Sequence, residues 1–157
     1  MDFYKFSRKL CGDRIFVRAY YYNAPVKQEQ DRQKHINQQK FFANLYRTEY
    51  LTVKLGRLEN RIIKQFIEGK VYEIPTWVEK GVDTNIVVDM LSMAYKNIYD
   101  TAILVSGDGD FAGAIEAVKE LGKHVEVAYT SYTFHLRQAC DKYILLTESL
   151  LKDCFVS

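Results

Sequence analysis

Hydrophobic residues along this chain change several times between helical spacing and strand-like runs. Apolar stripes at helical spacing predict helices over residues 2–12 and 35–48, and aromatic or β-branched runs predict strands over 14–22 and 50–55. In the second half the same reasoning predicts a helix opening at Asp83, a strand over 101–105, a helix ending at Gly122, a strand over 125–129, a short helix within 130–140, a strand over 143–146 and a terminal helix over 147–152. Alternation of strand and helix favours an α/β fold with a parallel sheet covered by helices.

One segment departs from this alternation. Two strand-like runs, residues 61–67 and 70–74, flank Glu68-Gly69, and glycine suits a tight turn. We expect a β-hairpin that projects from the sheet, as an insertion of residues 60–77 closed by Pro75 and Trp77.

The most informative stretch is residues 103–111, where an apolar run ends in Ser-Gly-Asp-Gly-Asp-Phe. A helical stripe of Phe111, Ile115, Val118 and Leu121 follows directly. Asp108 and Asp110 are therefore expected at the carboxyl edge of the sheet, where open α/β folds place their sites. Two carboxylates in one tight turn repel each other, and a divalent cation is the simplest compensation.

The aspartates also have ordinary structural interpretations. Asp83 and Asp110 suit helix N-caps, and Asp108 suits a turn. Asp89 lies six residues after Asp83, so the two side chains point about 120° apart on a helix. The pattern alone leaves both a metal site and these local roles open.

Bulk composition narrows the class of protein. The chain has 157 residues, 48% hydrophobic and 27% charged, as expected for one globular domain over residues 1–157. Without a membrane-length apolar run or the apolar core of a secretion signal, it is expected to be cytoplasmic. Its three cysteines form no CxxC pair, which argues against a zinc site or a disulfide framework.

Charge is unevenly distributed. Residues 1–80 carry 16 Lys/Arg against 9 Asp/Glu, whereas residues 81–157 carry 6 against 11. A basic half beside an acidic half is compatible with phosphate contacts next to a metal site, but scattered solvation charge explains it as well.

Several spaced motifs resemble the NYN domain, in its LabA-like branch. They are Glu79-Lys80-Gly81-Val82-Asp83, then Asp89-Met90-Leu91, the run from Tyr99 to Phe111, Gly122-Lys123-His124-Val125, Leu136, and Cys140-Asp141-Lys142-Tyr143-Ile144. The resemblance implies a Rossmann-like, PIN-like three-layer fold, with a mostly parallel central sheet flanked by helices. It also implies a ribonuclease that uses Mg²⁺ or Mn²⁺ to cleave RNA, whether single-stranded or structured.

The resemblance assigns roles position by position. Asp83, Asp108 and Asp110 match the family's acidic, metal-binding set, Asp89 matches a further acidic position and Ser106 a recurrent polar one. On chemical grounds Lys80 is a candidate phosphate ligand, and Lys64 and Lys70 of the hairpin are candidate RNA contacts.

The chain departs from the family at its beginning. Such domains open with a strand that ends in an aspartate, whereas here a helix pattern follows Met1 directly. We therefore expect the first strand to be missing, through truncation or degeneration. That departure favours a second class of function, a catalytically weak RNA-binding or regulatory module. A third class, a phosphatase or sugar transferase with an Asp-x-Asp motif, lacks the threonine that phosphatases place after it. The sequence leaves a homodimer open.

Overall fold

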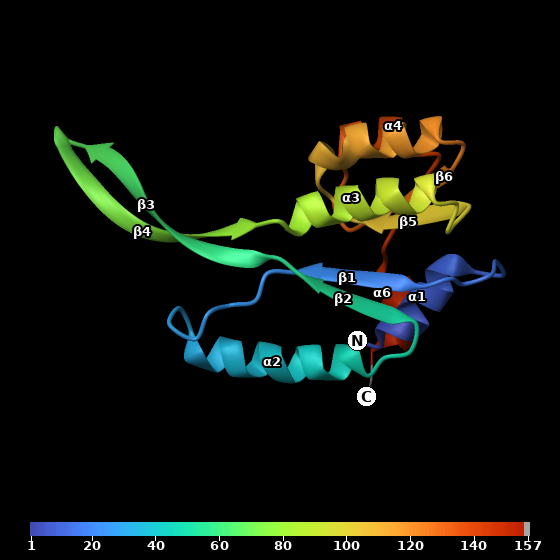
Figure 1. The fold of residues 1–157 in the computed structure, drawn as a ribbon, viewed down its shortest axis with the longest axis horizontal. Helices are drawn as coiled ribbons and strands as arrows, with labels where there is room; N and C mark the ends of the chain where they lie inside the picture. Colours follow the sequence, from blue (N-terminus) through green and yellow to red (C-terminus); the bar gives the residue numbers. More distant parts are fainter. Residues whose placement is uncertain (156–157) are drawn as a thin grey trace. The chain divides into compact units, whose positions relative to one another are not determined.

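A computed structural model describes residues 1–155, which divide into two compact units. The first contains residues 1–19, 48–51 and the chain from 86 onward, and the second contains residues 20–47 and 52–85. Along the chain (Figure 1) the longer elements are α1 (Phe3–Cys11), β1 (Ala19–Asn23), α2 (Arg32–Tyr46), β2 (Leu51–Leu55), β3 (Arg57–Ile67), β4 (Lys70–Lys80), α3 (Val82–Tyr95), β5 (Thr101–Val105), α4 (Ala112–Glu120), β6 (His124–Tyr129), α5 (Phe134–Ala139), β7 (Lys142–Leu145) and α6 (Glu148–Leu151). Short 3₁₀ helices, η1 (Gly109–Phe111) and η2 (Lys152–Cys154), precede α4 and follow α6.

The first unit is built on a parallel sheet with strand order β5-β6-β7. β6 is the middle strand, and Val125, Val127 and Ala128 on it have no exposed surface. A middle strand of a parallel sheet is covered on both faces, which explains why successive residues of β6 are buried. The core also takes Leu104 from β5 and side chains from three helices, which are Met90 and Ala94 of α3, Phe111, Ile115 and Val118 around α4, and Leu136 and Ala139 of α5.

The second unit contains most of a smaller sheet, β1-β2. The amide of Ala19 donates to the carbonyl of Tyr50, and the amide of Gly56 donates to that of Asn23, a pattern that makes the strands parallel. α2 buries Phe42 and Leu45. Asp31 caps its first turn by accepting the N–H of Lys34 at 2.9 Å.

The hairpin of the second unit is longer than its sequence pattern indicates. β3 and β4 have 11 residues each and pair antiparallel from Arg57–Lys80 to Ile67–Lys70 (Figure 1). The expected turn is confirmed: Glu68 and Gly69 have φ of 48° and 78°, the left-handed pair that a two-residue hairpin loop needs. Pro75 was expected to help close the hairpin, but β4 continues through it.

The predicted α/β class is confirmed, with parallel strands flanked by helices and one antiparallel hairpin. Three further local expectations were wrong. Residues 14–18 form no strand, because the guanidinium of Arg14 binds the carbonyls of Leu10 and Cys11 and so holds the chain at the end of α1. Tyr46, expected on the apolar stripe of residues 35–48, and Leu121 are exposed: Tyr46 is the last residue of α2, and Leu121 follows the last residue of α4.

Two observations about the described residues bear on function. Within residues 1–155, β5 pairs only with β6, so no strand is hydrogen-bonded to its other edge. No helix in this range combines the length and the hydropathy needed to cross a membrane.

Candidate functional site at the carboxyl edge of the sheet

The acidic turn follows β5 directly. The hydroxyl of Ser106 accepts the N–H of Asp108 at 3.1 Å, and Oδ1 of Asp108 accepts the N–H of Asp110 at 2.9 Å. Asp108 is thereby the N-cap of η1, which leads into α4. Both carboxylates are exposed. The turn role that the sequence left open for Asp108 is therefore present, and it leaves most of the carboxylate's acceptor capacity facing solvent.

A second loop holds this turn in place. Thr133 donates its hydroxyl to the carbonyl of Gly107 at 2.6 Å. A Cβ at Gly107 would lie 3.1 Å from the Ser131 hydroxyl, and one at Gly109 would lie 3.3 Å from Thr133 and 3.7 Å from His135. Residues 131–135 thus lie against the acidic turn, and the two glycines allow the close approach.

Aromatic rings surround this second loop. Tyr129 is the last residue of β6 and Tyr143 lies in β7, and their rings stack with centroids 3.8 Å apart. The Tyr143 hydroxyl accepts the N–H of Thr133 at 2.9 Å, which ties the loop to the stack. Tyr132 and Phe134 remain 64% and 58% exposed, so the segment that lies against the acidic turn carries two solvent-exposed aromatic rings.

These rings were not among the predicted site residues. Their signal was present as Tyr132, Phe134 and His135 within residues 130–140. It was not recognisable, because only the tertiary structure brings residues 131–135 against residues 107–109.

The other two predicted aspartates lie on α3. The helix begins at Val82, so Asp83 is exposed in the first turn and is not the N-cap that the sequence suggested. A carboxylate in this position still interacts favourably with the free N–H groups of the turn. Asp89 is half-buried and already engaged by other groups. Asp83 belongs to the second unit, whereas Asp89, Asp108 and Asp110 belong to the first.

The predicted RNA-contacting lysines all lie on the hairpin strands. Lys64 forms an ion pair with Glu73 across the strands, with Nζ and Oε1 3.4 Å apart. Lys70 closes the turn opposite Ile67, and Lys80 lies opposite Arg57. Trp77 of the hairpin is half-buried, and Lys27 lies 5.0 Å from its ring centroid. Trp77 therefore packs against a neighbouring segment of the second unit.

The carboxylate oxygens of the acidic turn are the type of ligand that a hard cation prefers. Mg²⁺ and Mn²⁺ prefer carboxylate oxygens, and Mg²⁺ often takes only one or two of them, completing its shell with water and substrate phosphates. Within residues 1–155, however, no three side chains of His, Cys, Asp or Glu come together as a metal-binding group. The three-aspartate set thus stays a prediction, with Asp108 and Asp110 as its structurally adjacent members.

A partly buried ion pair stabilises the amino-terminal half of β6. Glu126 is 3% exposed and receives both Nη atoms of Arg14, at 3.0 and 3.1 Å. His124 lies 3.3 Å from the same carboxylate. Burial alone would raise the pKa of Glu126, but hydrogen bonding and the charge of Arg14 outweigh it and lower the pKa. These residues connect α1 to the sheet and have a structural role.

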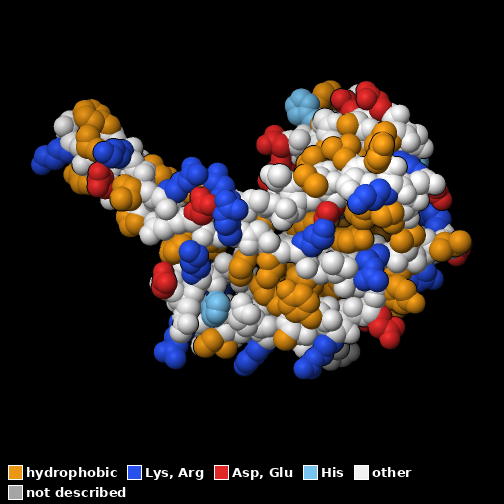
Figure 2. Space-filling model, in the orientation of Figure 1, with side chains coloured by type: hydrophobic (Ala, Val, Ile, Leu, Met, Phe, Trp, Pro, Cys, Tyr) orange, Lys and Arg blue, Asp and Glu red, His pale blue; other side chains and the backbone are white. Residues whose placement is uncertain are grey.

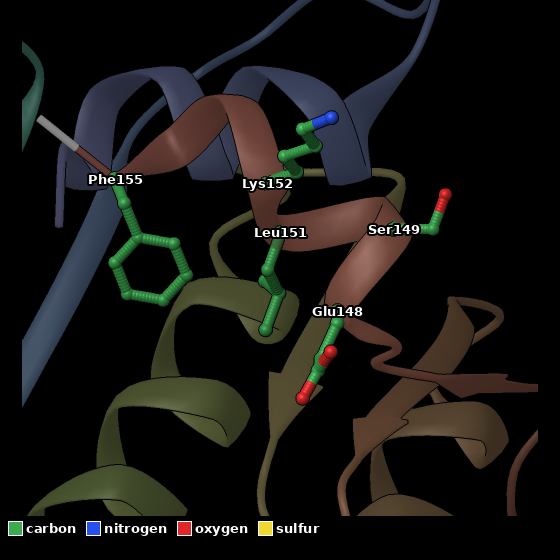
Figure 3. A pocket seen from close by; sticks show the side chains of 5 residues that line it. All are labelled: Glu148, Ser149, Leu151, Lys152 and Phe155. Atoms are coloured by element: carbon green, nitrogen blue, oxygen red, sulfur yellow. The ribbon is translucent and has the colours of Figure 1, made fainter. Parts of the chain in front are cut away.

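An open depression on α6 and η2 carries no comparable chemistry. It is lined by Glu148, Ser149, Leu151, Lys152 and Phe155. Figure 3 shows Glu148, Leu151 and Phe155 pointing to one side, with Ser149 and Lys152 pointing away. Glu148 is the one carboxylate of this lining, and the one other ionisable side chain, Lys152, points away from it, so the depression suits neither a metal nor acid–base catalysis.

Comparison with known proteins agrees with the motifs. Residues 1–147 match the NYN domain, a PIN-like nuclease family. A stretch of 70 residues is 39% identical to the low amplitude and bright protein LabA of Synechococcus elongatus. That match covers 43% of this chain and 37% of LabA, and no solved structure is significantly similar. With nearly its whole length matched, the chain belongs to the NYN domain family.

Proposed function

We propose that this protein is a metal-dependent ribonuclease whose reaction takes place at the Asp108–Asp110 turn. The observation that carries the proposal is the pair of exposed carboxylates at the carboxyl end of β5 in a chain of the NYN family. Exposed carboxylates repel an RNA phosphate, so RNA can approach this turn closely only when a cation lies between them.

The roles of the chain's own groups follow from their positions. Asp108 and Asp110 would hold Mg²⁺ or Mn²⁺, which supplies charge stabilisation and an activated water when bound. Asp83 stays the third ligand that the family motif predicts from sequence. Ser106 and Thr133 hold the turn so that both carboxylates face solvent together. Asp89 acts through other groups, because it is half-buried and engaged.

The RNA would be held beside the turn by aromatic stacking. Exposed rings such as those of Tyr132 and Phe134 bind unstacked bases, which favours a single strand as substrate. Lys70 and Lys80 remain candidate phosphate contacts. Lys64 is less suited, since Glu73 already neutralises it.

A second function, RNA binding without efficient cleavage, is favoured by two observations. The described residues bring no third ligand to the acidic turn, and β5 has no strand on its other edge within residues 1–155. A family member lacking part of its acidic set would keep the aromatic rings and lose the chemistry.

One experiment separates the two functions. Single-stranded RNA is incubated with the wild type in Mg²⁺, Mn²⁺ or EDTA, and with Asp108→Asn and Asp110→Asn. Glu116→Gln is the charge-matched control, because Glu116 is an exposed carboxylate of α4. We expect cleavage that requires a divalent cation, is lost in both asparagine variants and is unchanged in the control.

Binding measured in parallel by fluorescence anisotropy completes the test. RNA binding without cleavage by the wild type would favour the binding module. Cleavage that persists in both asparagine variants would contradict the assignment of the site, and absence of binding as well as cleavage would contradict both functions.

A further inference from the structure

The β3–β4 hairpin exposes apolar side chains on both of its faces. Directly opposed residues share a face and successive pairs alternate, so Ile63–Ile74 lies on one face and Phe66–Val71 on the other. The exposed fractions are 49% and 42% for the first pair and 73% and 59% for the second. Figure 2 shows hydrophobic side chains gathered toward the end of the hairpin.

Such a ribbon is unfavourable by itself. Two strands without a covering layer are marginally stable in water, and a contiguous exposed apolar surface marks an interaction site. The hairpin therefore needs a partner that supplies further strands or a covering surface.

Its charges favour a protein partner over a nucleic acid. Residues 57–80 contain five Lys/Arg and four Asp/Glu, which leaves a net charge of +1. Several of the cations are paired within the hairpin: Lys64 with Glu73 at 3.4 Å, and Arg57 and Arg61 with Glu59 at 2.8 and 3.7 Å. A nucleic-acid surface would present a clear excess of cations.

The two outer edges of the hairpin are not equivalent. The two-residue loop makes Ile67–Lys70 the closing hydrogen-bonded pair, and such pairs alternate along the ladder. Ile62–Pro75 and Lys64–Glu73 are consequently non-hydrogen-bonded pairs, whose backbone groups point outward. Pro75 has no N–H, so the outer edge of β4 lacks a hydrogen-bond donor near its centre. Every outward-facing residue of β3 has both its backbone N–H and its C=O.

We propose that β3 pairs antiparallel with β3 of a second copy of this chain, forming a four-stranded sheet β4-β3-β3-β4 across a two-fold axis. Ile62 is the central residue of β3, so an axis at Ile62 aligns all 11 residues of both strands. The five outward-facing residues of each β3 would then exchange about ten backbone hydrogen bonds, as many as a typical protein interface has.

The side chains suit this register. Ile62 faces Ile62 of the second copy, Phe66 faces Leu58, and Lys64 faces Asn60. No two like charges are opposed. An axis at Lys64 or Arg61 would instead place each cation against itself, which is destabilising.

Proline substitutions test the edge directly. Lys64→Pro removes an outward N–H of β3, and Glu73→Pro removes the outward N–H opposite it on β4. Neither substitution removes a β3–β4 ladder hydrogen bond, and both remove the same exposed ion pair, so the two variants are closely matched.

The measurement is the mass of the full chain in solution, by light scattering and sedimentation over a dilution series. We expect a dimeric wild type, a dimeric Glu73→Pro, and a Lys64→Pro variant whose dimer dissociates about 10- to 100-fold more readily, because two interface hydrogen bonds are lost. Circular dichroism checks that both variants remain folded.

A cysteine variant provides an independent readout of the register. Ile62→Cys is expected to form a disulfide-linked dimer on mild oxidation, whereas Ile74→Cys on β4 is not. A monomeric wild type, equal effects of the two prolines, or association only when RNA is added would each overturn the proposal.

Discussion

The β5-β6-β7 sheet and the β3-β4 hairpin are both rich in β-branched residues, yet their surroundings differ. Val125 and Val127 of β6 are completely buried, whereas Ile62 and Phe66 of β3 are 63% and 73% exposed. Apolar content therefore does not by itself decide which segment forms the core.

Connectivity explains the difference. Parallel strands must be joined by crossovers, which here are the helices α4 and α5, and these crossovers cover the sheet. The hairpin closes with two residues and brings no helix with it, so both faces of its turn end stay open. We infer that the parallel sheet provides stability and that the hairpin provides a surface for association.

The largest expected effect compares one substitution in both regions. Ile115→Ala in α4 should lower the free energy of unfolding by about 2–5 kcal/mol, because Ile115 has no exposed surface and its loss leaves a cavity. Ile62→Ala should change it by less than about 0.5 kcal/mol under conditions where the chain is monomeric. Urea denaturation measures both, and equal losses would contradict the comparison.

Loss of an ion pair should likewise destabilise the parallel-sheet region more than the hairpin. Arg14→Met leaves the Glu126 carboxylate buried and without its bidentate partner. We expect the free energy of unfolding to fall by about 1–3 kcal/mol. The loss is smaller than for a fully buried pair because the Arg14 side chain is 40% exposed. Lys64→Met, which breaks the exposed pair with Glu73, should cost less than about 1 kcal/mol. Thermal denaturation of the two variants provides the test.

RNA affinity should depend more on the aromatic rings of residues 132 and 134 than on the hairpin. If bases stack beside the acidic turn, Tyr132→Ala combined with Phe134→Ala should weaken single-stranded RNA binding about tenfold or more. Lys70→Ala combined with Tyr72→Ala in the hairpin should have a smaller effect. Anisotropy titrations in Mg²⁺ measure both, and a larger loss from the hairpin variant would reverse the assignment.

Lowering the pH should reduce the free energy of unfolding, because Glu126 becomes protonated. Its pKa is lowered in the folded protein, so the stabilisation is complete above the unfolded carboxyl pKa of about 4.3 and is lost as the pH falls through the folded pKa. The Arg14→Met variant should lose less stability over the same pH range, since the hydrogen bond and charge that lower the pKa are gone. Unfolding midpoints measured at successive pH values would show this, and parallel curves for the two proteins would exclude it.

Features that depend on neighbouring residues were largely predictable from sequence. The strand over Thr101–Val105, the turn at Asp108 and the apolar stripe of Phe111, Ile115 and Val118 agree with the structure. The glycine after α4 also agrees, since Gly122 has φ of 80° and donates to the carbonyl of Lys119. Hydrogen bonds and side-chain spacing over a few residues determine all of these.

Other features required knowledge of what each segment contacts. A proline signals the end of a strand, but β4 passes through Pro75 because the missing N–H faces away from β3. The residues that follow Arg14 have the aromatic and β-branched composition of a strand. The Arg14 side chain, however, binds Glu126, which is 112 residues away in sequence.

The amino-acid sequence by itself thus determined the α/β class and the acidic turn, because local periodicity and turn chemistry encode them. Its spaced motifs also carried the resemblance to the NYN family. Only the tertiary structure decided that Tyr132 and Phe134 lie beside that turn, that Glu126 is a buried structural carboxylate, and that the hairpin stays uncovered. These depend on contacts between residues far apart in the chain, which burial and strand connectivity select and no local pattern records.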